Sequence, residues 1–402
     1  MLNPSLLPTR LTAGFASLLC MAAVLSACGG GGSDSSSSTT QTATAFSAGP
    51  ITGFGSVIVN GVRFDDSAAK ISDDDGAAHE RSELKLGMMA EVEGADVKRD
   101  NAGSGSGRAI EIRIGAEIVG PATAVDVAGK TLTVIGQTVD VTDNTLFDER
   151  ITGGLAGISV GTIVEVNGVF NAANGHFTAT RIEPKPNAPF FKVRGMVAKL
   201  DTKLHTFEIG GAKISYDTIA AVAPAGLADG QLVRVKVQTT QVAGAWVAIS
   251  VKSGVRKVEN HDEAEVHGLI TAFTSATKFS VNGIAVDASN AVFPKGQTGV
   301  VLGARVEVEG KAVDGVIIAT KVSVEDENEE HKRGFELHGA ITELNGTAKT
   351  FVLRGVTVDF GGTVEFRKGS AATLALGSKV EVKGMLSADG KTLTAVRISF
   401  ED

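Results

Sequence analysis

Cysteine, tyrosine and tryptophan are nearly absent from this sequence. Its 402 residues include two cysteines, Cys20 and Cys28, and one residue each of tryptophan and tyrosine. Because Cys20 lies in an N-terminal segment that we expect to be removed, the mature chain has no pair of thiols for a disulfide. Stability must then come from hydrophobic cores, and roughly 370 mature residues are enough to form several of them.

Familiar catalytic motifs are missing as well. The chain has no Gly-x-Ser-x-Gly elbow, no His-Glu-x-x-His sequence and no cysteine nucleophile. The stretch GPITGFGSVIVNGVRFD (49–65) contains Gly-x-Gly, but the third glycine of a dinucleotide fingerprint is missing, and an alternating β-branched segment follows. We therefore predict that Gly53 and Gly55 lie between two strands and bind no phosphate. We expect that the protein is not an enzyme and that it has no catalytic residue and no cofactor.

The chain has no net positive charge, and tryptophan and tyrosine rings for stacking are scarce. The formal net charge is −8, and Trp246 and Tyr216 are the only residues of their types. The phenylalanines fall mostly within strand patterns, where a core position is expected. Proteins that bind single-stranded nucleic acids combine a basic groove with stacking aromatic side chains. We therefore do not expect nucleic acid as a partner.

A long apolar run occurs only near the N terminus. Residues 11–25 follow Arg10 and are too short for a comfortable membrane span, which needs about 20 apolar residues. They end in Leu-Ser-Ala-Cys, and we predict a cleaved signal peptide over residues 1–27. This pattern resembles the lipobox of bacterial lipoproteins, in which the cysteine, here Cys28, is lipidated and becomes the first mature residue. The alternative is an ordinary secretory signal with a chance cysteine.

The residues after Cys28 bear on the destination of the protein. Two or more acyl chains, at about 0.8 kcal/mol per buried CH₂ group, anchor a protein firmly to a membrane. This pattern resembles that of Gram-negative lipoproteins, whose sorting rule retains a protein in the inner membrane when Asp follows the cysteine. This chain has Gly29 at that place. We expect a bacterial cell-envelope lipoprotein of the outer membrane, on the periplasmic face or the cell surface. Residues 28–48, rich in Gly, Ser and Thr, are predicted to form a flexible tether of about 25 Å.

Four sequence landmarks recur five times in the same order. The first is a Gly-x-aliphatic start, and the starting glycines are 71 to 75 residues apart. The second is Gly-x-x-apolar, usually followed by Asp. The third is a glycine before alternating residues such as TIVEVNG, and the fourth is a short closing strand such as ATRIE. These landmarks predict repeat 1 over 49–115, repeat 2 over 116–188, repeat 3 over 189–258, repeat 4 over 259–330 and repeat 5 over 331–402.

Each repeat is predicted to contain four or five short strands. Gly, Asn and Asp stand at the turns, and no long window has helical periodicity. A five-stranded meander that curls shut removes its exposed edges, so we predict an all-β protein, a tandem array of about five small antiparallel OB-like β-barrels of about 70 residues each. An open sandwich is the alternative. The segment between the second and third landmarks holds either a short helix or a plain loop.

The first repeat carries the clearest resemblance to a known family. GPITGFGSVIVNGVRFD at 49–65, LKLGMMAEVEG at 84–94 and AIEI at 109–112 resemble the bacterial domain-of-unknown-function 5666 family, which occurs singly and in tandem in exported lipoproteins. Repeat 3 departs most, with Ser215 in place of Asp and Val237 in place of a glycine. The resemblance implies the repeated domain and the envelope address. It implies no activity, because the family has none assigned.

Aspartates recur at the second landmark in four repeats, as Asp65, Asp140, Asp287 and Asp359. A carboxylate at the end of a strand most often accepts hydrogen bonds from turn amides, so a structural role is favoured over ligand binding. The acidic sequence DDDG at 73–76 fails the calcium-loop template, because the first ligand position falls on Ile71.

Two histidines stand beside acidic residues at equivalent places. His267 and His338 immediately precede the starting glycines of repeats 4 and 5, and the acidic linkers upstream bear His261 and His331. Imidazole and carboxylate ligands would suit a divalent cation between repeats. The spacing matches no defined site, however, and repeats 2 and 3 have Val and Arg at the same place. The favoured interpretation is a solvated acidic linker, and no metal ligand is assigned.

Two functions from different classes remain. The first is a structural or adaptor lipoprotein, in which five barrels in a row form an extended rod on a lipid tether. The second is an envelope module that binds a glycan, a peptide or a divalent metal. We favour the first. The expected partners are the membrane, through the lipid anchor, and an unidentified protein or envelope polymer.

Overall fold

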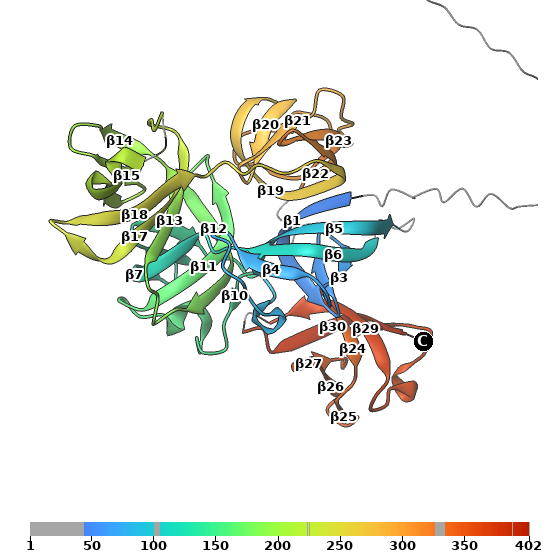
Figure 1. Cartoon of the computed structure of the whole chain (residues 1–402). Coiled ribbons are helices and arrows are strands. Elements are labelled where there is room, and N and C mark those ends of the chain that lie inside the picture. Colours follow the sequence, from blue (N-terminus) through green and yellow to red (C-terminus); the bar gives the residue numbers. More distant parts are fainter. Residues whose placement is uncertain are drawn as a thin grey trace, which may run out of the picture. The chain divides into compact units, whose positions relative to one another are not determined.

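Each of the five repeats folds into a small closed β-barrel (Figure 1). The computed structural model describes residues 44–99, 105–222, 224, 226–325, 334–387 and 389–401. The predicted signal peptide, Cys28 and His331 lie outside the described residues. Within the described residues, the only helices are short 3₁₀ turns, and none has the length and apolar character needed to cross a membrane. The prediction of an all-β protein with OB-like repeats is confirmed.

Repeat 1 illustrates the strand order that all five barrels share. β1 (Thr44–Phe54), β2 (Val57–Val59) and β3 (Val62–Asp65) form an antiparallel meander. β3 pairs in parallel with β6 (Gly105–Ile114), and β6 pairs antiparallel with β5 (Met89–Arg99). β5 then pairs with β1 and closes the barrel, so no edge of the sheet stays open. A closed five-stranded barrel with this crossover is OB-like.

The other four barrels have equivalent strands. Repeat 2 contains β7 (Ile118–Asp126), β8 (Thr131–Val134), β9 (Gln137–Asp140), β11 (Ile163–Asn171) and β12 (His176–Pro184). Repeat 3 contains β13 (Phe191–Met196), β14 (Ala198–Asp201), β15 (Thr206–Ile209), β16 (Ala212–Ser215), β17 (Leu232–Val242) and β18 (Ala245–Ser253). Repeat 4 contains β19 (His261–Ser275), β20 (Lys278–Val281), β21 (Ile284–Asp287), β22 (Arg305–Val313) and β23 (Val316–Val324). Repeat 5 contains β24 (Phe335–Ala340), β25 (Glu343–Asn345), β26 (Thr350–Leu353), β27 (Val356–Asp359), β29 (Lys379–Leu386) and β30 (Thr392–Phe400).

Short elements fill the segment between the third and fourth barrel strands. In four repeats this segment holds a 3₁₀ helix: η1 (Arg81–Glu83), η2 (Gly154–Gly157), η3 (Asp217–Val222) and η4 (Ala371–Thr373). Three barrels also carry a short strand parallel to their last strand: β4 (Lys70–Asp73), β10 (Leu146–Phe147) and β28 (Glu365–Arg367).

Alternation along the strands decides which side chains fill each barrel. In β8, β15 and β26 every second residue is buried, because successive side chains of a strand point to opposite faces. The largest fully buried side chains include Phe64, Phe177, Phe207 and Phe351. Burial of one such side chain stabilises the fold by about 1.5–3 kcal/mol.

The first strand begins earlier than the sequence indicates. β1 starts at Thr44, and Ala45, Phe46 and Ala48 are buried. The prediction that the flexible tether extends to residue 48 is therefore wrong for its last five residues, 44–48. These residues are ordered because they find strand partners on two sides, β5 of repeat 1 and β19 of repeat 4.

β1 also brings repeats that are distant in sequence into contact. It runs parallel to β19 at residues 45–48 and parallel to β24 at Gly53 and Phe54. A Cβ atom on Gly53 would lie 2.2 Å from the main-chain oxygen of Glu336, and one on Gly55 would lie 2.2 Å from Cβ of His338. The two glycines thus permit close strand approach, and the expected simple row of barrels is wrong, since repeat 1 pairs directly with repeats 4 and 5.

Candidate functional site

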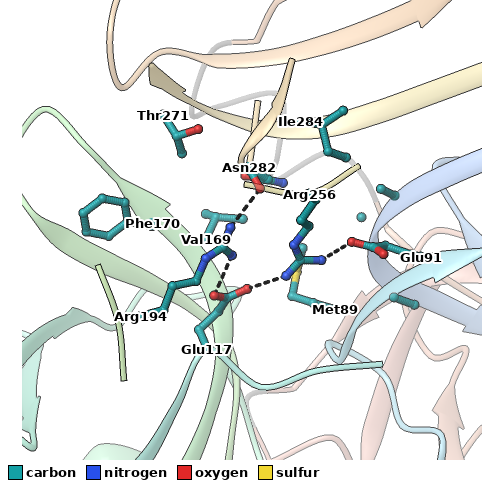
Figure 2. Close-up of a pocket in the computed structure, with 14 residues that line it drawn as sticks. Met89, Glu91, Glu117, Val169, Phe170, Arg194, Arg256, Thr271, Asn282 and Ile284 are labelled. Atoms are coloured by element: carbon teal, nitrogen blue, oxygen red, sulfur yellow. Dashed lines mark hydrogen bonds and ion pairs between the residues drawn. The ribbon is translucent and has the colours of Figure 1, made fainter. Parts of the chain in front are cut away.

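A group of charged side chains, most of them buried, lies where four repeats meet (Figure 2). Glu91 comes from β5 of repeat 1, Glu117 from the residue before β7 of repeat 2, and Arg194 from β13 of repeat 3. Arg256 follows β18. The side chains of Arg194 and Glu117 are only 3% and 4% exposed. We refer to these four residues as the junction cluster.

Arg194 joins three repeats through its guanidinium group. Its Nη1 donates to Glu117 at 2.7 Å, and its Nη2 donates to the main-chain oxygens of Gly254 and Asn282, each at 3.0 Å. Burial lowers the pKa of Arg194, and the charge of Glu117 opposes this effect. An arginine still stays protonated. The partners matter because an unpaired buried charge costs several kcal/mol.

Arg256 connects the two glutamates of the junction cluster. Its Nη2 lies 3.2 Å from Glu117 and its Nη1 donates to Glu91, whose second oxygen accepts from Arg113 at 3.1 Å. Burial raises the pKa of Glu91, but Arg256 and Arg113 lower it by more, so the carboxyl group has a pKa below its ordinary value. The cluster therefore contains two cations and two anions and is balanced in charge.

The cavity beside the junction cluster is small. Its volume is about 20 Å³, and Met89, Val169 and Phe170 also line it. This space holds about one water molecule, whereas pockets for small organic ligands measure about 300–1,000 Å³. The Nε–H of Arg194 has no partner within the described part of the chain, and a water molecule is a partner of suitable size. The geometry suits a structural junction rather than a site for a sugar or a peptide.

A second charged contact joins repeat 1 to repeat 3. Asp74 lies 2.9 Å from Nζ of Lys192 and also accepts from Arg234, and Asp75 lies 2.7 Å from Nζ of Lys236. Burial raises the pKa of Asp74, but Lys192 and Arg234 lower it by more, and the net pKa is below its ordinary value. The acidic loop that fails the calcium template thus has basic side chains of repeat 3 as its partners.

In repeat 4, His267 lies among three carboxylates. Glu265 and His267 are two residues apart on β19 and share one face, and Glu307 of β22 is directly opposite His267. Nε2 of His267 is 2.9 Å from Glu265 and 3.8 Å from Glu307. Nδ1 is 3.8 Å from Glu325, which follows β23. We refer to these four residues as the repeat-4 cluster.

Repeat 5 contains the equivalent set, the repeat-5 cluster of Glu336, His338, Glu381 and Glu401. Nε2 of His338 is 2.5 Å from Glu336 and Nδ1 is 2.7 Å from Glu401, while Glu381 is directly opposite on β29. Lys383 adds a positive charge, with Nζ 2.8 Å from Glu336. Burial raises the pKa of Glu336, but hydrogen bonds from His338 and Lys383 lower it by more, so its pKa is below the ordinary value.

The four histidines considered from the sequence have different surroundings. His267 and His338 each contact carboxylates of their own repeat, which differs from the alternative of a cation held between repeats. His261 lies apart from both clusters. Its ring stacks on Phe46 at 5.8 Å, and burial lowers its pKa. Its ring nitrogens have no hydrogen-bond partner among the described residues. His331 is outside the described residues.

The recurring aspartates mostly hold turns. Asp65, Asp287 and Asp359 each accept the main-chain N–H of the residue two positions later, at 2.8–3.0 Å. Asp140 differs, because it contacts Nδ1 of His176 at 3.0 Å. Among the residues that the structure describes, none of the four aspartates has the other carboxylates around it that a metal site requires.

The junction cluster was not predicted from the sequence. A signal was present, because Arg194 interrupts the apolar pattern of a strand at the place where repeats 4 and 5 have histidine. Its partners, however, come from several repeats, and only the tertiary structure brings Glu117 and Arg256 to it.

Three segments of the chain match the family model of a domain of unknown function, DUF5666. The matched residues are 119–183, 267–323 and 338–399, within repeats 2, 4 and 5. The resemblance to this repeat family is thereby confirmed. The matched segments include neither repeat 1, where the resemblance is clearest by eye, nor repeat 3, which departs most.

A solved structure is similar over part of the chain. It is described as "drosophila Unr CSD456", and it is 16% identical over 42% of this chain and 78% of that one, with a TM-score of 0.16. A TM-score this low supports no inference about function. The search of curated proteins found no match to this chain.

Proposed function

We propose that the chain is a lipid-anchored structural or adaptor protein of the bacterial cell envelope, without enzymatic activity. The junction cluster is the observation that carries this proposal. Its ion pairs, of which Arg194 with Glu117 is fully buried, join repeats 1, 2 and 3, and Arg194 also bonds the main chain of repeat 4. Barrels that are held together in this way suit a protein that presents fixed surfaces to partners.

The size of the cavity supports the same proposal. The cavity at the junction has room for about one water molecule, which leaves no space for an organic substrate. The anchor is supported by the sequence alone, through the short apolar segment before Cys28 and the Gly29 that follows it. We place the protein at the outer membrane, on its periplasmic face or at the cell surface.

Membrane fractionation tests the anchor. We expect the wild-type chain in the membrane fraction and the Cys28→Ser variant in the soluble fraction, because the variant lacks the thiol that carries the lipid. Cys20→Ser is the matched control, since this cysteine lies within the predicted signal peptide, and it should stay with the membrane. Retention of Cys28→Ser in the membrane fraction would refute the lipid anchor.

Thermal unfolding of the full chain in detergent tests the structural role. A ligand that binds only the folded state stabilises it by about 2.7 kcal/mol at one hundred times its dissociation constant. For peptidoglycan fragments, lipopolysaccharide, peptides and oligonucleotides we expect no rise in the unfolding midpoint. A saturable rise with one glycan or peptide would replace the adaptor role with that of a ligand-binding module. That second candidate is favoured by one observation, the histidine and carboxylate clusters of repeats 4 and 5.

A further inference from the structure

We propose that the repeat-4 cluster binds one divalent metal ion through Glu265, His267 and Glu307. The inference deepens the ligand-binding candidate and rests neither on the lipid anchor nor on the adaptor role. One imidazole nitrogen with carboxylate oxygens is a ligand set used for zinc, manganese and related divalent ions. The chemistry of the set is therefore that of a metal site and not only of an acidic patch.

The distances suit a single ion. Two ligand atoms that each lie about 2 Å from one ion are about 3–4 Å from each other. Nε2 of His267 is 2.9 Å from Glu265 and 3.8 Å from Glu307, and one ligand atom from each of the three residues lies within 4.8 Å of the others. Glu265 and His267 are 4% and 8% exposed, so the strands β19 and β22 hold these groups in a protected place.

Glu325 has the position of a residue that orients the histidine. A metal-bound histidine almost always donates its second ring N–H to a carboxylate, a carbonyl or water, which fixes its tautomer. Glu325 lies on the Nδ1 side of His267 at 3.8 Å, opposite the proposed metal ligands. The equivalent Glu401 lies 2.7 Å from Nδ1 of His338. In both repeats Nε2 thus faces the glutamate two residues earlier on the same strand, and Nδ1 faces a glutamate that follows the last barrel strand.

The repeat-5 cluster has a built-in competitor for the metal. Lys383 lies directly across from Glu336, at the position where repeat 4 has Glu309 across from Glu265. Its ammonium group contacts Glu336 and Glu381 at 2.8 and 3.4 Å, and a divalent ion would have to displace it. Arg63 of repeat 1 approaches the same cluster, with Nη1 3.1 Å from Nδ1 of His338. A divalent ion in repeat 5 would therefore compete with two cations of the chain, Lys383 and Arg63.

Calorimetric titration tests the site. The full chain, stripped with a chelator and kept in detergent, is titrated with zinc chloride and separately with manganese chloride. We expect one tight site for at least one of these ions, and its loss in His267→Gln and in Glu307→Gln. Glu325→Gln should weaken the affinity about 10- to 100-fold, because it removes only the orienting carboxylate.

Matched variants separate metal binding from a general effect of losing a histidine. His176 contacts a single carboxylate, Asp140, so His176→Gln should keep the tight site. His338→Gln should also keep it. Thermal unfolding of the metal-free variants shows whether each is folded. The visible absorption of bound cobalt(II) gives a second measure of metal coordination, because the spectrum changes when an imidazole ligand is lost.

Two results would overturn the inference. One is the absence of tight binding by the wild-type chain to either ion, and the other is a tight site that persists in both His267→Gln and Glu307→Gln. The repeat-4 cluster would then be a network of hydrogen bonds only. Cys28→Ser should bind metal like the wild type, so failure of the anchor and failure of the metal site are distinguished.

Discussion

One position distinguishes the five repeats at the scale of a single residue. The residue before the starting glycine is Ala48, Val119, Arg194, His267 or His338. In every barrel it lies directly opposite a residue of the fourth barrel strand. The backbone geometry is therefore shared, and the side chain decides whether the position packs against apolar groups, forms the junction cluster or lies among carboxylates.

Arg194→Met should lower the free energy of unfolding by about 3 kcal/mol. The change leaves the buried carboxylate of Glu117 without one of its two arginine partners. Removal of one member of a buried ion pair costs about 3–5 kcal/mol. Urea unfolding of both proteins measures the difference. Arg367→Met is the control, because Arg367 is half exposed and its solvent-screened pair with Glu365 contributes little to stability. Equal effects of the two substitutions would show that the junction cluster contributes little.

Asp148 gives a prediction on pH. Its side chain is 1% exposed and contacts Lys85 at 3.1 Å, Arg150 at 2.5 Å and Arg181 at 3.2 Å. Burial raises its pKa, but the hydrogen bonds from Arg150 and Lys85 lower it by more, and the folded-state pKa is well below the ordinary value of 3.8. A lowered pKa stabilises the folded state above pH 3.8, and this contribution is lost as the pH falls toward the folded-state pKa.

Asp148→Asn should therefore destabilise the protein by about 3 kcal/mol at neutral pH. The deficit relative to the wild type should be constant above about pH 5 and shrink below about pH 4. Urea unfolding across this range measures it. A deficit that does not change with pH would mean that the lowered pKa of Asp148 makes no contribution to stability.

At the scale of elements, β1 belongs to more than one barrel. It closes the barrel of repeat 1 through β5, and its side chains Phe46 and Ala48 pack in the hydrophobic core of repeat 4. Its far end pairs with β24 of repeat 5. A strand that the sequence places partly in a tether thus connects three repeats.

Phe46→Ala should lower the free energy of unfolding by about 3–5 kcal/mol, as expected for a buried phenylalanine. Phe46 is 4% exposed and stacks on His261, whereas Phe273 on β19 is 41% exposed. Phe273→Ala is therefore the matched control and should cost less than about 1 kcal/mol. Thermal and urea unfolding compare the two variants. A mild effect of Phe46→Ala would mean that residues 44–48 do belong to the tether.

At the scale of the whole molecule, charged contacts couple repeats that are not adjacent in sequence. The loop of repeat 1 at Asp74 and Asp75 binds basic residues of repeat 3, and the junction cluster adds repeats 2 and 4. Asp74 is 9% exposed, so its pairs are protected from solvent. We expect repeats 1 and 3 to unfold together for this reason.

Asp74→Asn should separate that unfolding into two steps. The substitution removes the charge that Lys192 and Arg234 share, and the loss of one partner from a buried ion pair costs about 3–5 kcal/mol. Differential scanning calorimetry should show a broader or divided transition than in the wild type. Asp389→Asn, in an exposed turn of repeat 5 where the carboxylate accepts hydrogen bonds from Ser387 and Lys391 of the same turn, should leave the transition unchanged. A single unchanged transition in both variants would contradict the coupling.

The sequence by itself determined the all-β class, the repeat and the OB-like barrel. These follow from local rules: alternation places one face of each strand inside, and turn residues such as Asn60 and Gly61, with φ of 54° and 74°, set the hairpins. It also pointed to His267 and His338, since both precede a starting glycine. The start of β1 was not predictable, because residues 44–48 are ordered by pairing with β19 of another repeat. The contacts of His267 with Glu307 and Glu325 were not predictable either, because strand pairing brings these residues together.

Only the tertiary structure decided how the repeats meet. Contacts such as Arg194 with Glu117 and Asp74 with Lys192 join residues 77 and 118 positions apart, and no local pattern encodes them. The physical reason is that a barrel closes on its own hydrogen bonds and leaves its outer face free to vary. The sequence determines which side chains lie on the outer face of each barrel. The partner of each buried charge, however, depends on how one barrel packs against another.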